Sequence, residues 1–439
     1  MRYVLLIGGS LWIGVIAAQP GYFPPLATDE WATTDPATLG YCPAAVDSLY
    51  AFLEARNSAA FLLVEDGRIV LERYFGDFEV TTPHVWNSAG KTVTALAVGI
   101  AQREGLLDLD DPASDYLGVG WTSCDSTAEA AITIRHLLAQ SSGLDDDVPD
   151  IYCTLPECLT CLTEPGQRWA YHNGAYTQLT YILEAASGQA LNPFINQRIR
   201  QPTGMNGGYF GAGYNRVFGS TARSMARFGL LALNGGDWAD TPVLDDSTYF
   251  REMTTPSQSL NPAYGYLWWL NGQANFRLPG VPFVIDGPLV PTAPATLLAA
   301  IGKNGQLLLV DPDRQRIIIR MGNDPGYGSG VVGVQLTTEL WSYVAALSCS
   351  TNTTNPSQAL TIELTPQPAS TYLSVRAAMA ELRQASLFSA RGQCLVDRSI
   401  ARPTERIDLA LTEVPPGLYW LRIITTEGQL LWRSVVVQR

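Results

Sequence analysis

The sequence predicts an α+β protein with helices on an antiparallel sheet and a small β-sandwich at its end, and three observations lead to this class. Residues 44–55 have helical apolar spacing, and two strand-like runs, 60–64 and 69–74, follow with a turn signal between them. Strand signals then stop and return only near residue 264. Short alternating runs separated by turn pairs fill the region after residue 360, as in a β-sandwich.

The elements between these landmarks place a helical insert within one sheet. Residues 19–40 are rich in Pro, Thr and Asp and are expected to be an extended lead-in. An apolar helical run at 92–102 opens a long region of helices and loops that reaches about residue 235. Four strand signals and a helix then follow: 264–270, 296–301, 307–310, 317–321 and 335–347. We therefore expect one sheet built from both ends of this region.

The charge balance excludes one class of partner. The 439 residues include 41 acidic and 28 basic side chains, a formal charge of −13, and no basic cluster. A nucleic-acid backbone would be repelled by such a field. The hydrophobic content of 46% is that of an ordinary packed globular protein, and the chain is long enough for two or three domains.

The first 18 residues have the pattern of a cleaved secretory signal. Arg2 precedes an apolar core at 3–16, and two alanines end the segment. We therefore expect a protein that is secreted or held at the cell surface. No later stretch reaches the ~18 uninterrupted apolar residues of a membrane helix, so we expect no stable membrane span.

Seven cysteines in an exported chain predict disulfides, and the odd count leaves at least one thiol unpaired. Four of them gather in one region: Cys124, Cys153, Cys158 and Cys161. No second Cys or His pair stands near Cys158 and Cys161 at zinc-ligand spacing, so we expect structural bridges there and neither a metal nor another cofactor. Cys42 and Cys349 flank the central region and are candidates for joining its ends.

Ser88 and Lys91 are the leading catalytic candidates. They lie three residues apart at the front of the apolar helical run, where a helix would bring both side chains to one face. A serine attacks poorly unless a neighbour takes its proton, and a lysine can do so when burial and a helix N-terminus lower its pKa. Because Ser-x-x-Lys also occurs by chance, other motifs must decide.

Two further motifs follow in order, Tyr171-His172-Asn173 and Lys303-Asn304-Gly305-Gln306. With them the chain resembles the serine β-lactamase and penicillin-binding-protein superfamily, which carries Ser-x-x-Lys, Tyr-x-Asn or Ser-x-Asn, and Lys-Thr-Gly-like motifs in this order. The resemblance covers residues 41–348 and is nearest to the 6-aminohexanoate-dimer hydrolase and esterase branch. It includes the framework stretches 132–138 and 142–144.

The resemblance implies a β-lactamase/transpeptidase-like antiparallel sheet flanked by helices, with a helical subdomain, and a role for each motif residue. Ser88 would be the acylated nucleophile, Lys91 its base, and Tyr171 a proton relay to the leaving group and the deacylating water. Asn173 would hydrogen-bond the substrate and Lys91. The oxyanion would sit between the backbone amides of Ser88 and Gln306, at about 3 kcal/mol per donor.

The third motif departs from the superfamily pattern. Asn304 replaces the usual hydroxyl residue before Gly305, which puts recognition of a substrate carboxylate, and with it penicillin binding, in doubt. Lys303 either aids substrate binding or is a solvated lysine at a strand end, and both readings stay open. His172 is interpreted as structural. Trp169, Trp268 and Trp269 line an acyl pocket or belong to the core.

The leaving group stays open, because amide, ester and lactam hydrolysis share acyl-enzyme chemistry. We expect a small-molecule or short-peptide amide or ester as substrate, with a D-Ala-D-Ala carboxypeptidase or β-lactamase as the alternative. A catalytically inactive surface binding protein on the same fold is an alternative of another class, although every proposed catalytic side chain is present.

Two other enzyme classes fit the sequence less well. Gly90-Lys91-Thr92 resembles the end of a P-loop, but Val85 occupies the place of the required earlier glycine. A Ser-His-Asp hydrolase would need a Gly-x-Ser-x-Gly elbow, which is absent. Its base would be one of three histidines, and His136 among them is interpreted as a core or capping residue.

The last region resembles a different family. Residues 365–369, 387–393 and 416–422, with a basic-ended run at 433–439, are similar to the type IX secretion sorting domain. This resemblance implies a bacterial secretion machinery as partner, and an accessory β-sandwich that binds polymer or carbohydrate is the other reading. We expect the polar stretch 349–359 to be a linker, and the domain at 360–439 neither to line the active site nor to support its core.

Overall fold

The computed structural model describes residues 21–281, 283–327, 333–349, 361–378, 380–389, 393–426 and 430–438. The expected signal, residues 1–18, and nearly all of the expected linker lie outside these ranges. Residues 21–35 of the lead-in contain no helix, in keeping with the expected extended segment, but Pro36–Leu39 form a short 3₁₀ helix. The lead-in is held against the rest of the chain by Arg227, whose guanidinium donates hydrogen bonds to the carbonyls of Pro25 and Thr28 at 2.7 and 3.0 Å.

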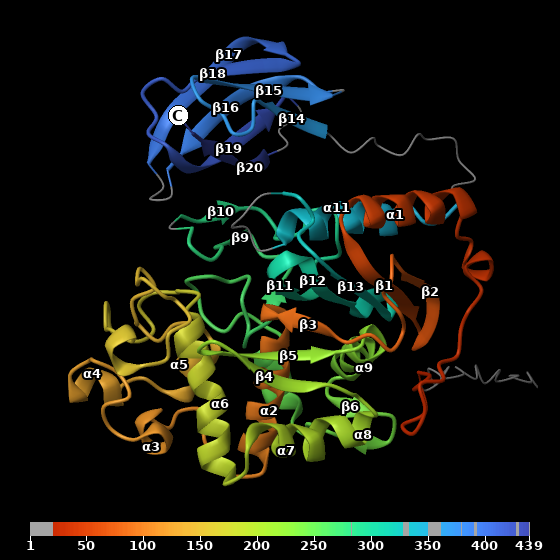
Figure 1. Ribbon diagram of the computed structural model, residues 1–439, viewed down its shortest axis with the longest axis vertical. Coiled ribbons are helices and arrows are strands. Elements are labelled where there is room, and N and C mark those ends of the chain that lie inside the picture. Colours follow the sequence, from red (N-terminus) through yellow and green to blue (C-terminus); the bar gives the residue numbers. More distant parts are fainter. Residues whose placement is uncertain are drawn as a thin grey trace, which may run out of the picture.

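A six-stranded sheet lies at the centre of the larger body, in the order β2-β1-β13-β12-β11-β8 (Figure 1). Its strands are β1 (Ser58–Glu65), β2 (Arg68–Tyr74), β8 (Trp269–Leu270), β11 (Leu298–Gly302), β12 (Gln306–Asp311) and β13 (Arg316–Gly322). Every pairing is antiparallel. Early strand β1 pairs with late strand β13, which confirms that one sheet is built from both ends of the region.

Helices cover both faces of this sheet. On one face lie α1 (Pro43–Ala55) and α11 (Val334–Ala345), and on the other α2 (Lys91–Arg103) and α9 (Ala222–Leu233) (Figure 1). Gly229 allows α9 to sit close to the strands, because a Cβ there would lie 2.6 Å from Ile317 and 2.7 Å from Leu308. With both faces covered, β12 and β13 are buried along their whole length, so the runs 307–310 and 317–319 within them are apolar without alternation.

The region between β2 and β8 is richer in elements than the sequence pattern predicted. It holds a three-stranded sheet of β3 (His84–Asn87), β5 (Asn215–Ser220) and β4 (Gly208–Ala212). Its helices are α3 (Ser114–Leu117), α4 (Ser126–Ala130), α5 (Ile134–Leu138), α6 (Asn173–Ser187), α7 (Leu191–Ile195), α8 (Gln201–Thr203) and α10 (Ser247–Met253). Of the framework stretch 132–138, residues 134–138 form the short α5. The short two-stranded pair of β6 (Asp237–Trp238) and β7 (Thr241–Pro242) completes the region, and a second such pair, β9 (Asn275–Phe276) and β10 (Ile285–Asp286), follows β8.

Three disulfides tie these parts together. Cys42–Cys349 joins the residue before α1 to the end of the region, as expected. Cys124–Cys161 and Cys153–Cys158 close the loops around α4 and before α6. Since Cys158 and Cys161 bond to different partners, they form structural bridges and no redox pair between them. Cys394 is free and exposed.

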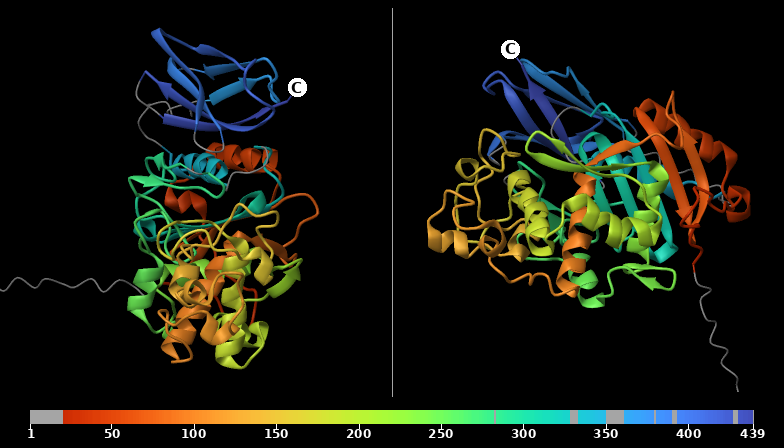
Figure 2. Two further views of the ribbon diagram at one scale, coloured as in Figure 1. Left: turned by 90° about the vertical axis from the view of Figure 1, so that its left-hand side faces the viewer. Right: turned by 60° about the horizontal axis from the view of Figure 1, so that its bottom comes forward.

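The C-terminal strands form a separate β-sandwich, as predicted. One sheet contains β14 (Thr361–Thr365), β15 (Tyr372–Ala378) and β18 (Arg406–Ala410). The other contains β17 (Cys394–Thr404), β16 (Leu382–Phe388), β19 (Gly417–Thr425) and β20 (Leu430–Val437). Inward residues of both sheets make an apolar cluster of their own. Figure 2 shows the sandwich beside α11 from two further directions.

The sandwich also contributes to the larger body, which corrects the expectation that it gives no support to that core. Phe283, in the loop between β9 and β10, contacts the rings of Phe388 and Trp432 at centroid distances of 6.1 and 5.3 Å. Trp420 packs into the main core cluster. Burial lowers the pKa of Arg433, opposed by the nearby carboxylate of Glu339 on α11. None of these contacts involves a candidate site residue.

Ending the chain after Cys349 tests how the two bodies depend on each other. This truncation keeps the Cys42–Cys349 disulfide but exposes Phe283. We expect near-normal kcat/KM, and a loss of about 1–3 kcal/mol of unfolding free energy from the uncovered aromatic surface. Thermal unfolding and ester hydrolysis measure both effects. Trp432→Ala in the full chain removes one of the rings that contact Phe283 and serves as the matched comparison. A truncated chain that fails to fold would show that the sandwich is an obligatory part of the core of the larger body.

Candidate active site

Ser88 lies in a single turn, Ser88–Gly90, that leads directly into α2. The residue before it, Asn87, has φ 50° and ψ −134°, a costly conformation for a residue other than glycine. The Asn87 side-chain amide donates a hydrogen bond of 2.9 Å to the carbonyl of Lys303. The turn is thereby fastened to the end of β11, and the serine remains partly exposed at the mouth of a buried helix.

Lys91 is 2% exposed and lies beside the serine as the sequence predicted. Its Nζ donates to Ser88 Oγ at 3.1 Å and to Asn173 Oδ1 at 2.8 Å. Burial lowers the pKa of Lys91 to about 7. A substantial fraction is therefore neutral near neutral pH and able to accept the serine proton.

Tyr171 completes a three-residue cluster. Lys91 Nζ lies 5.0 Å from the centre of the Tyr171 ring. Burial raises the pKa of Tyr171 well above its ordinary value, and its interaction with the Ser88 hydroxyl opposes this rise. The phenol is therefore protonated at neutral pH and can give a proton as well as pass one on.

Aromatic rings surround Tyr171 and settle the two readings of the tryptophans. Trp269 stacks on Tyr171 at 6.2 Å, and Trp169 packs against both rings. Both tryptophans are buried. Trp268 instead stacks on Phe228 in the core. Two of the three tryptophans thus pack around Tyr171, and the third is a core residue.

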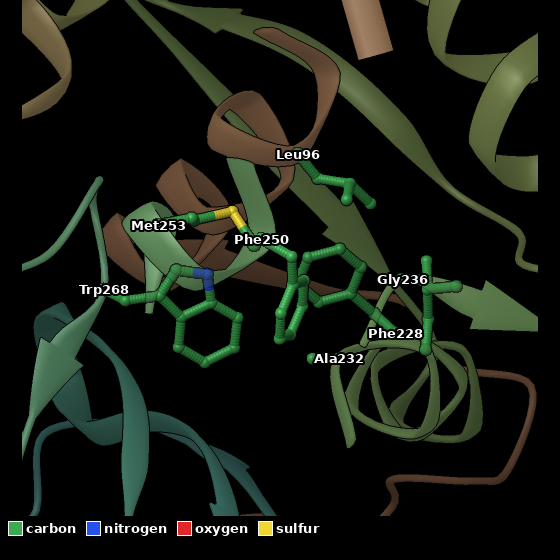
Figure 3. A pocket seen from close by; sticks show the side chains of 8 residues that line it. Leu96, Phe228, Ala232, Gly236, Phe250, Met253 and Trp268 are labelled. Carbon is green, nitrogen blue, oxygen red and sulfur yellow. The ribbon is translucent and has the colours of Figure 1, made fainter. Parts of the chain in front are cut away.

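An enclosed cavity of about 10 Å³ lies beside Trp268, between α2, α9 and α10 (Figure 3). Its wall is apolar and includes Leu96, Phe228 and Met253, and the Trp268 indole N–H makes no hydrogen bond within the described residues. A space of this size is at the limit for one water molecule and offers it almost no polar partners. The cavity is a packing defect behind α2 and supplies no catalytic group.

The third motif lies at the turn between two neighbouring strands of the central sheet. Lys303–Gly305 forms the turn between β11 and β12, and Gly305 faces Leu336 and Arg320. Gln306 pairs opposite Gly302 in the ladder, and its side chain hydrogen-bonds the backbone of Gly322. These contacts turn Gly305 and the Gln306 side chain towards other parts of the sheet.

Gly302 is the glycine that touches the nucleophile turn. A Cβ at this position would lie 2.3 Å from the carbonyl oxygen of Trp86 and 3.1 Å from the amide nitrogen of Ala89. The geometry therefore favours the amide of Lys303, the residue after Gly302, over that of Gln306 as the second oxyanion donor. The motif pattern missed this because residues 300–302 read Ala-Ile-Gly, without the lysine that was expected at the start of the motif.

The remaining motif residues have structural roles. Asn304 has φ 63°, a left-handed turn conformation that asparagine tolerates, and its exposed side chain replaces the expected hydroxyl. His172 Nδ1 accepts a hydrogen bond from the amide of Ala175 at the start of α6, which confirms its structural interpretation. His136 forms a capping box with Thr133, as expected for a capping residue.

Known proteins share both the sequence pattern and the fold that carry this site. Residues 46–337, more than half of the chain, match the family model described as Beta-lactamase. The chain belongs to the beta-lactamase family. This family member is 30% identical over 171 residues to penicillin-binding protein 4* of Bacillus subtilis. The match covers 33% of this chain and 36% of that relative, so the chain spans about a third of the relative's length.

Solved structures of other proteins share the fold of this beta-lactamase family member. A Bacillus anthracis structure, assigned provisionally as a 6-aminohexanoate-dimer hydrolase, is 20% identical and covers 76% of this chain and 87% of its own, with a TM-score of 0.53. The octameric penicillin-binding-protein homologue of Pyrococcus abyssi is 15% identical and covers 88% of this chain and 99% of its own, with a TM-score of 0.53. At these identities the likeness shows the fold alone.

Metal-ligand clusters and membrane helices are both missing from the described residues. No group of three or more His, Cys, Asp or Glu side chains is placed to hold a metal ion in that part of the chain. None of the helices that the structure describes is long and apolar enough to cross a membrane.

Proposed function

We propose that this beta-lactamase family member is a serine hydrolase that cleaves an amide or ester through an acyl-enzyme. The observation that carries the proposal is the buried Lys91, whose Nζ lies 3.1 Å from Ser88 Oγ and whose pKa is lowered to about 7 by burial. A buried lysine with a lowered pKa can act as a general base. A lysine with a purely structural role would instead stay charged and pair with a carboxylate.

Acylation begins when neutral Lys91 takes the proton of Ser88 and the Oγ atom attacks the substrate carbonyl carbon. The carbonyl oxygen becomes an oxyanion, which the backbone amides of Ser88 and Lys303 are proposed to bind. Tyr171 then gives a proton to the departing nitrogen or oxygen and the bond to the leaving group breaks. Tyr171 is reprotonated from Lys91, and the same groups remove a proton from the water that hydrolyses the ester.

The polar groups around the serine favour a short amide or ester over a penicillin. The exposed Asn304 stands in place of a hydroxyl that would bind a substrate carboxylate. Lys303 provides an exposed positive charge, and its backbone carbonyl is hydrogen-bonded to Asn87, the residue before Ser88. We propose the 6-aminohexanoate-dimer hydrolase and esterase branch on this basis. D-Ala-D-Ala carboxypeptidase or β-lactamase activity is the alternative.

A substrate panel tests this assignment. We expect kcat/KM to be highest for p-nitrophenyl esters of short acids or for short linear amides, and lower for cyclic amides, a D-Ala-D-Ala peptide and a chromogenic cephalosporin. A cephalosporin or D-Ala-D-Ala peptide that exceeds every ester and linear amide would move the protein to the alternative class. Absence of turnover for the whole panel, with Ser88 unreactive, would favour an inactive binding protein.

We also propose that the protein is exported and then carried to the surface or the medium by type IX-like secretion, with residues 360–439 as the sorting domain. The signal pattern at 1–18 and the separate core of the sandwich support this. Fractionation of the native bacterium tests it. A chain without the sandwich should stay in the periplasm, and unchanged export would instead make the sandwich an accessory module.

A further inference from the structure

Gln140 is a buried turn residue whose role the motifs do not explain. It comes after α5, is 3% exposed and has φ 56°, in the left-handed region that few residues other than glycine adopt. A glutamine in this conformation is costly unless its surroundings hold it there. Two kinds of contact do so, one through the backbone and one through the side chain.

Both contacts reach the segment that carries Tyr171. The amide of Ala170 donates to the Gln140 backbone carbonyl at 2.9 Å. The amide of His172 donates to Gln140 Oε1 at 2.7 Å. Gln140 Nε2 in turn donates to the carbonyl of Leu137 in α5 at 3.5 Å, which orients the side-chain amide. One residue therefore binds the N–H groups on both sides of the tyrosine.

The two hydrogen bonds to Gln140 bear on catalysis because the residues next to Tyr171 also belong to the site. In extended backbone, N–H groups two residues apart point the same way, so two bonds to one partner fix the segment between them. The next residue is His172, which caps α6, and then Asn173, which accepts the 2.8 Å hydrogen bond from Lys91. A displacement of about 1 Å in such groups can cost about 100-fold in rate.

We propose that Gln140 is the positioning residue that holds Tyr171 against Ser88 through the amides of Ala170 and His172. The inference rests on the proposed hydrolase function and deepens it. Gln140 does not meet the substrate, so its loss acts on the proton-transfer steps and leaves substrate binding nearly unchanged.

Two substitutions separate the hydrogen bonds from the packing. Gln140→Met keeps the volume and removes the acceptor for the His172 amide and the donor to Leu137. Gln140→Glu in its protonated form restores both, since a buried carboxyl has a raised pKa and its O–H can donate while its C=O accepts. With p-nitrophenyl butyrate, we expect Gln140→Met to lower kcat about 10- to 100-fold with little change in KM. Gln140→Glu should recover most of that loss.

A matched control distinguishes positioning from stability. Gln178 on α6 is also buried, and its Nε2 donates to the carbonyl of Thr154 at 3.1 Å. Gln178→Met removes a comparable bond away from Tyr171, so it should lower Tm by a similar amount and leave kcat near the wild-type value. In a Tyr171→Phe background, Gln140→Met should have little further effect on kcat, because the group that it positions is already gone.

The outcomes are separable. Wild-type kcat in Gln140→Met, an equal fall of kcat in Gln178→Met, or additive effects with Tyr171→Phe would each overturn the positioning role while the hydrolase function stands. A wild-type protein that neither hydrolyses p-nitrophenyl butyrate nor reacts with a serine-directed organophosphonate would overturn the hydrolase function itself, and the positioning role with it.

Discussion

Replacing Ser88 by alanine is expected to reduce kcat by at least about 10³-fold, because the acyl-enzyme can no longer form and only binding and oxyanion contacts remain. The change removes one oxygen atom from a partly exposed turn, so the unfolding free energy should change by about 1 kcal/mol or less. Steady-state hydrolysis of a p-nitrophenyl ester and thermal unfolding measure the two quantities.

A matched control is available on the opposite face of the sheet. Ser48 is an exposed residue of α1, where its hydroxyl donates only to the carbonyl of Ala44. Ser48→Ala makes the same chemical change and should keep wild-type activity. Turnover of more than a few per cent in a folded Ser88→Ala protein would remove Ser88 from the role of nucleophile.

Replacing Lys91 by arginine is expected to cost about 10²- to 10⁴-fold in kcat, although the positive charge is kept. Arginine does not deprotonate in the working range, so the general base is lost. Because the larger side chain must fit a fully buried site, Lys91→Met is the companion variant, with similar length and no charge. Single-turnover acylation measures the effect. Near-normal acylation in a folded Lys91→Arg protein would show that the lysine acts only as a charge.

The lowered pKa of Lys91 also fixes the direction of the pH dependence. Because the neutral amine is the base, kcat/KM should rise with pH along a limb with its midpoint near the folded-state pKa of about 7. Burial raises the pKa of Tyr171 well above this range, so the limb near pH 7 reports Lys91. Lys91→Met should remove the limb together with the activity.

The same lysine also makes the stability of the protein depend on pH. In the unfolded chain a lysine keeps its proton up to about pH 10.4, whereas the folded protein releases it near pH 7. Between these values the unfolded state binds more protons, so the contribution of Lys91 to stability rises with pH and is smallest below pH 7. Thermal unfolding of the wild type and Lys91→Met across this window compares the two slopes.

Local spacing explains why part of the site was predictable. Ser88 and Lys91 are three residues apart at a helix start, so one helical turn suffices to bring them together. The Tyr171-His172-Asn173 motif could also be predicted from the sequence. Its three residues are consecutive, and it follows the Ser88 motif in the order that the superfamily has. The continuous apolar runs that became β12 and β13 likewise identified the central sheet.

Contacts between distant segments were not predictable. The approach of Gly302 to the Ser88 turn depends on how β11 packs against that turn, and the motif pattern at 303–305 gave no sign of it. The short strands β4 and β5 are rich in small and turn-forming residues and carry little alternation, so they were missed. Gln140 carries no motif at all, and only the fold shows that it faces Ala170 and His172.

Covalent labelling of the nucleophile tests the central claim most directly. The full-length protein is treated with a serine-directed organophosphonate at pH 8, digested, and analysed by mass spectrometry. We expect a single phosphonylated site at Ser88, no labelling of Ser88→Ala, and slow labelling of Lys91→Arg, because the geometry makes the buried lysine responsible for activating that one hydroxyl. Labelling at another serine, or ester turnover with Ser88 left unmodified, would contradict the account.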